Sequence, residues 1–134
     1  MIEVGTPRRR AGPVILVVDD DEYVHSTLAA AMRGLRPEIV RATTAAAGLQ
    51  LALDRHPDLA IVDVGLPDLD GYALTRAMRA RAELTDMPIC ILTGQMPDEA
   101  LAREAGANAI VAKPFRLNEF LDTVRSQLRI VADP

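Results

Sequence analysis

The chain has 134 residues, 49% of them hydrophobic and 25% charged, which suits one domain with an apolar core and excludes a low-complexity chain. Its formal net charge of -4 argues against direct binding to nucleic acid, because phosphate contacts need a clustered basic surface. The single cysteine, Cys90, lies in an apolar run, so it is interpreted as a small core residue. Because no secretory signal pattern and no bilayer-length apolar run is present, we expect a cytoplasmic protein without a membrane segment.

Five short apolar runs have the length of strands, and each is followed by a candidate helix; three of these have clear helical spacing, and those at 72–82 and 98–105 are less strongly patterned. In chain order, the expected strands are residues 14–18, 38–42, 59–62, 88–92 and 109–112. The expected helices are residues 24–35, 46–53, 72–82, 98–105 and 117–128. Runs such as VILVV are continuously apolar, which is typical of parallel strands covered by helices on both faces. The sequence therefore predicts an α/β fold with a parallel sheet, in which the more polar run 38–42 is an edge strand.

Charged and hydroxyl side chains that could bind ions or react lie where these expected strands end. They are Asp19, Asp20 and Asp21 after the first strand, Asp63 after the third, Thr93 after the fourth and Lys113 after the fifth. In an open doubly wound sheet, ligands bind outside the carboxyl ends of the strands. Several carboxylates at one rim repel each other unless a cation lies among them, and their oxygens suit a hard ion such as Mg²⁺. A hydroxyl and an ammonium at the same rim add donors for an anion, and a carboxylate can accept a phosphoryl group covalently.

Four segments resemble the signature blocks of response-regulator receiver domains of two-component signalling. They are VVDDD from Val17, IVDVGLPDLDG from Ile61, ILTG from Ile91 and AKPF from Ala112. The resemblance covers residues 14–131, and it implies a flavodoxin-like, doubly wound sheet of five parallel strands in the order 2-1-3-4-5 with five helices. We expect the domain at 13–131, between a flexible arm at 1–12 that lacks apolar periodicity and a short tail at 132–134.

The resemblance also implies the roles of the acidic residues. Asp63 resembles the phosphoacceptor and a metal ligand, Asp20 the direct Mg²⁺ ligand, and Asp19 a ligand through water. The remaining ligand in the family is a backbone carbonyl two residues past the acceptor, here that of Gly65. Such a domain catalyses only its own phosphorylation and dephosphorylation, so we do not expect an enzyme that turns over a free substrate.

Two further residues are similar to those that bind the phosphoryl group in the family. Thr93 resembles the hydroxyl that bonds a phosphoryl oxygen, and Lys113 the cation that pairs with it, with Lys113–Pro114 as the family's cis peptide. The switch positions are then Thr93 and Ile110. Receivers usually carry Tyr or Phe at the second position, and an aliphatic side chain cannot make the aromatic swing, so the readout is expected to differ. Asn108 stands where DNA-binding members often have Asp, which weakens the analogy to their dimer interface.

Partners follow from the same resemblance. The expected phosphodonor is a histidine kinase or a histidine phosphotransfer protein that docks near the first helix. A downstream protein or attached output domain would use the fourth helix, fifth strand and fifth helix, within residues 98–128, and a homodimer is left open. One alternative is a binding-only receiver that does not depend on phosphate. Another is a small aspartyl-phosphate phosphatase, which would use Asp19 and not Asp63 as nucleophile, although its D-x-D-x-[TV] motif is not matched.

Simpler interpretations apply to several other residues. Asp21 is interpreted as a helix N-cap alone. His25 and His56 are expected on the solvated surface, since each lies in a polar stretch. Met78, Met87 and Met96 are expected to pack in the core or against helices.

Overall fold

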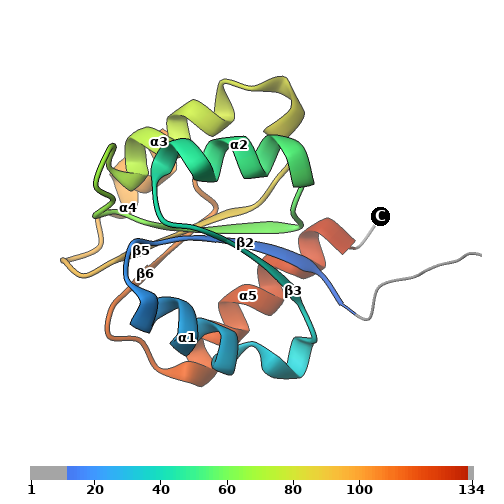
Figure 1. The fold of residues 1–134 in the computed structure, drawn as a ribbon. Coiled ribbons are helices and arrows are strands. Elements are labelled where there is room, and N and C mark those ends of the chain that lie inside the picture. Colours follow the sequence, from blue (N-terminus) through green and yellow to red (C-terminus); the bar gives the residue numbers. More distant parts are fainter. Residues whose placement is uncertain (1–11, 133–134) are drawn as a thin grey trace, which may run out of the picture.

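The computed structural model describes residues 12–132, which form one five-stranded parallel sheet covered by helices on both faces (Figure 1). The strands are β2 (Val14–Val18), β3 (Glu38–Ala42), β4 (Leu59–Asp63), β5 (Ile89–Thr93) and β6 (Ala109–Ala112). Their order across the sheet is β3-β2-β4-β5-β6, which is the order 2-1-3-4-5 along the chain. This order confirms the expected fold class, and β3 is an edge strand as its polar pattern predicts.

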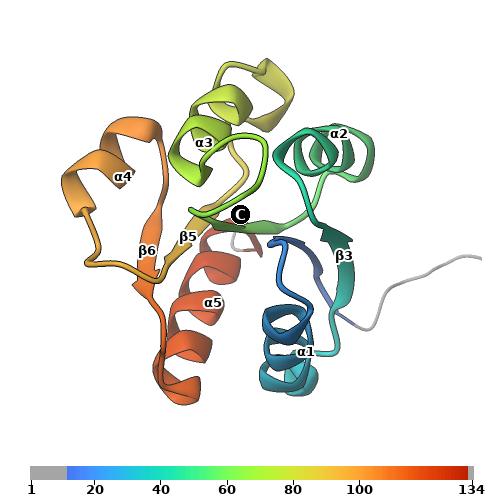
Figure 2. The same cartoon turned by 60° about the vertical axis from the view of Figure 1, so that its left-hand side comes forward.

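Helices cover the two faces unequally (Figures 1 and 2). One face carries α1 (Glu22–Ala31) and α5 (Leu117–Ala132), and the other carries α2 (Ala45–Arg55), α3 (Gly71–Arg79) and α4 (Glu99–Ala105). Short 3-10 turns, η1 (Arg33–Leu35) and η2 (Ala82–Leu84), follow α1 and α3. The expected arm at 1–12 lies outside the described residues apart from Gly12, as does the tail apart from Ala132, which belongs to α5.

The continuously apolar strands form two cores because successive side chains point to opposite faces. Leu16 and Val62 pack in the cluster beneath α2 and α3, whereas Val17 and Ile61 pack in the cluster beneath α1 and α5. Every residue of β2, β4 and β5 is buried. The three central strands are therefore packed on both faces.

Helix N-termini gather at the same end of the sheet as the carboxyl ends of the strands, because each strand runs directly into the next helix. The side chains of Asp21, Thr44, Asp70 and Asp98 each accept a backbone N–H bond in the first turn of the helix that follows. The cap by Asp21 confirms its interpretation. The carboxyl ends of the strands and the N-termini of the helices thus lie at one end of the described structure, together with the strand-end residues Asp19, Asp63, Thr93 and Lys113.

Several expectations need correction, among them the helix expected at 24–35, which begins at Glu22 and ends at Ala31, before η1. Asp63 and Thr93 are the last residues of β4 and β5 and do not lie beyond them. The helix expected at 72–82 ends at Arg79, where Ala80 caps it, and η2 follows. The packing prediction for Met96 was wrong: its side chain is exposed, because α4 begins only at Glu99 and leaves Met96 in the preceding loop. Within residues 12–132, no helix is both long and apolar enough to cross a bilayer.

Candidate functional site

Three carboxylates meet at the carboxyl end of the sheet. Asp19 follows β2 and Asp63 ends β4, and these two strands are paired with Val18 opposite Val62. One oxygen from each of Asp19, Asp20 and Asp63 lies within 4.8 Å of the others. Asp19 and Asp63 are buried while Asp20 is exposed, so the cluster opens to solvent on one side.

The ammonium of Lys113 reaches into this cluster from the end of β6. Its Nζ lies 2.8 Å from Oδ1 of Asp63 and 3.5 Å from Oδ2 of Asp19. Its backbone N–H donates to the carbonyl of Thr93 at 2.6 Å, which ties the start of the β6–α5 loop to β5. The Lys113–Pro114 peptide is cis, as expected. Residues far apart in sequence are thereby brought to one carboxylate.

The charges of the cluster perturb one another. Burial raises the pKa of Asp19, and the charge of Asp63 adds to this, against the Asp21 N–H and Lys113, which lower the pKa. Burial alone lowers the pKa of Lys113, but its hydrogen bonds and charge interactions with Asp63 and Asp19 outweigh burial, so the net pKa is raised. Lys113 is therefore charged at neutral pH. The electrostatic cost of ionising Asp19 in a buried site is only partly offset.

Backbone and hydroxyl groups complete the surroundings of Asp63. The N–H of Gly65 donates to its Oδ2 at 3.1 Å. Thr93 is buried, and its Oγ1 accepts from the N–H of Gln95 at 3.1 Å. A Cβ at Gly71 would lie 2.4 Å from the carbonyl oxygen of Asp63, so only glycine lets α3 begin this close to β4. The expected site residues Asp19, Asp20, Asp63, Gly65, Thr93 and Lys113 all lie at this end of the sheet.

The donor set fits a magnesium ion. Mg²⁺ takes oxygen ligands and is usually held by one or two carboxylates while it keeps several waters. The cluster of Asp19, Asp20 and Asp63 offers three carboxylate oxygens with an open side. Burial is the main cause of the raised pKa of Asp19, and the charge of Asp63 adds to it, so Lys113 does not fully balance the negative charge at this site. A divalent cation would supply that balance.

Two residues beside the site were missed or misplaced from the sequence. His25 was expected on the surface, and this was wrong: its side chain is buried, with Nε2 2.7 Å from the carbonyl oxygen of Asp19. Its position three residues before Leu28 and seven before Met32, both buried, is the signal that could have placed it on the inner face of α1. Asp68 in the β4–α3 loop accepts the N–H groups of Ala45 and Ala46 at 2.8 and 3.0 Å. His56 is exposed, as expected.

The family model for the response regulator receiver domain matches residues 15–125. This match includes the residues of the site and all five strands except Val14, the first residue of β2. The chain belongs to the response-regulator receiver family. Receivers are signalling domains and not classical enzymes.

Relatives of known structure share the receiver fold. A putative response regulator from Chloroflexus aurantiacus is 37% identical, with a TM-score of 0.82 over 87% of this chain and 98% of that one. The receiver domain of the sensor histidine kinase PA1611 from Pseudomonas aeruginosa is 29% identical, with a TM-score of 0.79 over 88% and 98%. That structure has a magnesium ion coordinated in its active-site cleft.

Among curated proteins, the transcriptional regulatory protein PrrA of Mycobacterium tuberculosis is 35% identical over 119 residues, 87% of this chain and 50% of PrrA. The polar-differentiation response regulator DivK of Brucella ovis is 28% identical over 116 residues, 85% of this chain and 94% of DivK. This receiver therefore spans about half the length of PrrA and nearly the whole of DivK.

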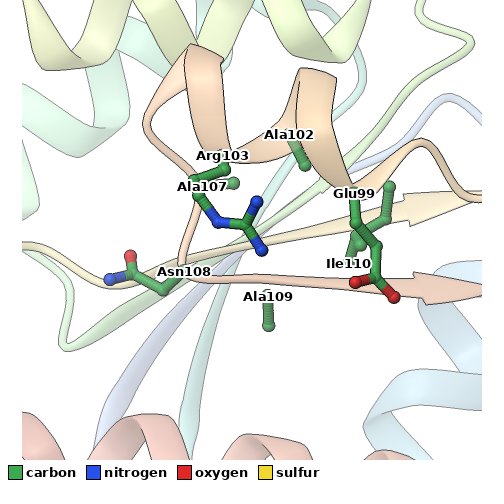
Figure 3. A pocket seen from close by; sticks show the side chains of 7 residues that line it. All are labelled: Glu99, Ala102, Arg103, Ala107, Asn108, Ala109 and Ile110. Carbon is green, nitrogen blue, oxygen red and sulfur yellow. The ribbon is translucent and has the colours of Figure 1, made fainter.

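A second feature of the receiver lies between α4 and β6. A pocket of about 260 Å³ is lined by Glu99, Ala102 and Arg103 on α4, by Ala107 and by Asn108, Ala109 and Ile110 at β6 (Figure 3). The side chain of Ile110 is half-buried, and it is paired with Ile91 in the β5–β6 register. The two expected switch positions, Thr93 and Ile110, thus belong to neighbouring strands.

Proposed function

We propose that Asp63 accepts a phosphoryl group from a phosphohistidine of a histidine kinase or phosphotransfer protein, in a Mg²⁺-dependent reaction that switches a protein-binding surface. The observation that carries this proposal is the position of Lys113, 2.8 Å from Asp63 Oδ1 and 3.5 Å from Asp19 Oδ2. A carboxylate beside an ammonium and two further acidic groups has what phosphoryl transfer needs, namely a cation for the phosphoryl oxygens and ligands for a metal ion.

In the proposed step, the P–N bond to the donor imidazole breaks while a bond forms between phosphorus and a carboxylate oxygen of Asp63. The imidazole is the leaving group, so no other reactant is needed. Lys113 would pair with one phosphoryl oxygen, while the hydroxyl of Thr93 would donate to another. Asp19, Asp20, Asp63 and the carbonyl of Gly65 would hold Mg²⁺, which when bound neutralises charge on the phosphoryl oxygens.

Apolar surface around the site supports a protein as the donor. Within the described part of the chain, the exposed large apolar side chains all lie at the end of the molecule that carries the acidic cluster: Tyr23, Leu69, Met96 and Leu117. A cavity of about 460 Å³ runs from Tyr23 on α1 to Lys113 and Phe115. Exposed apolar side chains near a reactive group are typical of a docking surface. The donor would therefore dock over α1 and the β6–α5 loop, in the cytoplasm.

The output surface is proposed to be α4, β6 and α5. Thr93 and Lys113 connect the site to this surface, because the Lys113 N–H donates to the Thr93 carbonyl at the end of β6. Ile110 lines the pocket between α4 and β6, where a change in β6 would alter its shape (Figure 3). The downstream partner is a protein or an output domain of the same polypeptide, and nucleic acid is not expected to bind this chain directly.

The deciding experiment is the intact-protein mass after incubation with acetyl phosphate or phosphoramidate and Mg²⁺. We expect the mass of one phosphoryl group to be gained, and neither chelated samples nor Asp63→Asn to show the gain. Mapping of the acid-labile phosphate to Asp19 would support the phosphatase alternative. If a folded wild type that binds Mg²⁺ gains no mass from either donor, the phosphoacceptor function is wrong and a binding-only receiver is favoured.

A further inference from the structure

His25 is buried beside the acidic cluster and contacts it through the backbone. Only 4% of the residue is exposed, and Nε2 lies 2.7 Å from the carbonyl oxygen of Asp19. A carbonyl oxygen only accepts, so Nε2 must carry the hydrogen of this bond. Within residues 12–132, the other ring nitrogen, Nδ1, is buried without a hydrogen-bond partner. An apolar side chain would avoid the cost of burying Nδ1, so packing alone does not account for an imidazole here.

The carbonyl that His25 holds belongs to the peptide that leads into Asp20. A peptide unit is planar, so fixing its oxygen also fixes its N–H and the direction in which the chain enters Asp20. Asp20 is exposed, and its carboxylate makes no hydrogen bond or ion pair with other described residues. By contrast, Asp19 Oδ1 accepts from the Asp21 N–H at 2.9 Å, and the Asp19 N–H donates to the Ala42 carbonyl at 3.0 Å.

The backbone of His25 is held in place by hydrogen bonds at the start of α1. It lies in the first turn of α1, which Asp21 caps by accepting from the Tyr23 N–H at 2.9 Å. The backbone N–H of His25 donates to the Asp21 carbonyl at 3.2 Å. Hydrogen bonds therefore hold the β2–α1 loop against the start of α1. Among them, the bond to the Asp19 carbonyl comes from a helix side chain, the imidazole of His25.

We propose that His25 is a positioning residue for the metal site: its Nε2–H bond to the Asp19 carbonyl orients the Asp19–Asp20 peptide so that the Asp20 carboxylate faces the cluster. The proposal rests on the proposed function, in which these carboxylates bind Mg²⁺. His25 touches neither the metal nor the phosphoryl group. We expect His25 to affect metal affinity. Without its bond, the β2–α1 loop would become ordered only when the metal binds, and the cost of that ordering would reduce the binding free energy.

The test compares His25→Leu, which removes the donor, with His25→Gln, whose side-chain amide can restore a donor at similar reach. Mn²⁺ affinity is measured by electron paramagnetic resonance, with urea unfolding run in parallel. We expect His25→Leu to weaken Mn²⁺ binding roughly tenfold or more and His25→Gln to recover most of the loss. The control His56→Asn changes the exposed histidine at the C-cap of α2, where Asn tolerates the left-handed backbone, and should bind as wild type does.

Phosphorylation kinetics separate positioning from a general structural role. The Mg²⁺ concentration for half-maximal rate should rise in His25→Leu, while the rate at saturating Mg²⁺ stays near that of wild type. Unchanged Mn²⁺ affinity in a folded His25→Leu would overturn the proposal, as would a folded His25→Gln that binds no better than His25→Leu. If His25→Leu does not fold, the nitrogen-15 spectrum of wild type decides, because the two histidines are readily assigned and a ring with hydrogen only on Nδ1 excludes the bond.

These outcomes are distinct from failure of the proposed function. If wild type itself binds no Mn²⁺ or Mg²⁺, the metal site is wrong. If wild type binds metal but takes up no phosphate, only the phosphoacceptor role of Asp63 falls, and the metal-affinity comparison still tests His25.

Discussion

The ammonium of Lys113 lies 2.8 Å from Oδ1 of Asp63, across 50 residues of sequence. This contact joins the end of β6 to the end of β4, and the same ammonium is 3.5 Å from Asp19. Lys113 thus occupies the place of a counter-ion to the cluster. A cation in that place should affect metal binding and phosphoryl transfer in opposite directions.

Replacement of Lys113 by Gln tests this. Loss of the ammonium removes repulsion of a divalent ion, so Mg²⁺ affinity should rise several-fold, whereas phosphorylation by acetyl phosphate should slow by about 10²-fold or more. Calorimetric Mg²⁺ titration and time-resolved intact mass measure the two effects. Lys113→Arg, which keeps the charge, is the control. A parallel fall of both quantities would show that Lys113 acts on the fold and not on the transferred group.

The raised pKa of Asp19 predicts that the ionised site lowers the stability of the metal-free protein. Burial is the main cause, so in chelator the ionised carboxylate costs stability, and Asp19→Asn should raise the unfolding midpoint at pH 7 by a few degrees. Below the unfolded pKa, about 4, both states are protonated and the difference should vanish. It should grow as pH rises through the raised folded pKa and then stay constant.

Added Mg²⁺ should reverse the ranking. Wild type gains stability from an ion that binds only the folded state, and Asp19→Asn gains less. Thermal unfolding from pH 3 to pH 8, with and without Mg²⁺, checks both parts. A wild type more stable than Asp19→Asn in chelator at pH 7 would contradict this assignment of the pKa shift.

Asp68 predicts an acid-sensitive link between the β4–α3 loop and α2. Hydrogen bonds from the N–H groups of Ala45 and Ala46 lower its pKa. Its stabilising effect is therefore present above the unfolded pKa and lost as pH falls through the lower folded pKa. Asp68→Ala should lower the unfolding midpoint at pH 7 and speed amide exchange at Ala45 and Ala46, but match wild type near pH 2. Asp122→Ala, in the exposed part of α5, should do neither.

Arg79 closes the opposite end of α3 against the turn before β6. Its guanidinium donates to the carbonyls of Gly106 and Leu84 at 2.8 and 2.7 Å, and to Oδ1 of Asn108 at 2.9 Å. That oxygen also accepts from the Ile89 N–H at 2.8 Å. Asn108 is exposed, but its Oδ1 is shared by two donors, the Arg79 guanidinium and the Ile89 N–H.

We expect Arg79→Ala to lower the free energy of unfolding by about 2–3 kcal/mol, because several partly buried carbonyls lose a charged donor. Asn108→Ala should cost about 1–2 kcal/mol, and the double variant should cost less than the sum. Asn108→Asp keeps both acceptor contacts and should stay close to wild type. Urea unfolding of the four variants measures this, and strict additivity would mean that the two side chains act independently.

The sequence predicts much of the site because the strands run parallel, which determines the edge of the sheet at which their last residues lie. Residues at the ends of parallel strands must meet at one edge, so Asp19, Asp63, Thr93 and Lys113 could be placed together before any coordinates. The sheet order came from family resemblance, since apolar patterns show which segments are strands but not which strands are neighbours. The carboxylate oxygens that Lys113 contacts depend on side-chain conformation, which no pattern encodes.

The failures have equally physical causes. His25 lies in a stretch with several polar residues, yet the helical period, and not the composition of that stretch, decides its burial. Met96 is apolar but follows a strand end, where the chain has left one packed element and not yet entered the next. Asp68 looks like one loop carboxylate among several, and only the approach of α2 gives it two backbone donors.

Lys113 is the only lysine in the sequence, and every other basic side chain except the two histidines is an arginine. Its side chain is 24% exposed in contact with Asp63 and Asp19. Apart from the N-terminal amine, an amine-selective reagent therefore has one target in the whole chain, and that target is the site itself. The rate at which Lys113 is modified would report on changes at the site, such as altered contacts with Asp63 and Asp19, without a fluorophore, a tag or an engineered residue.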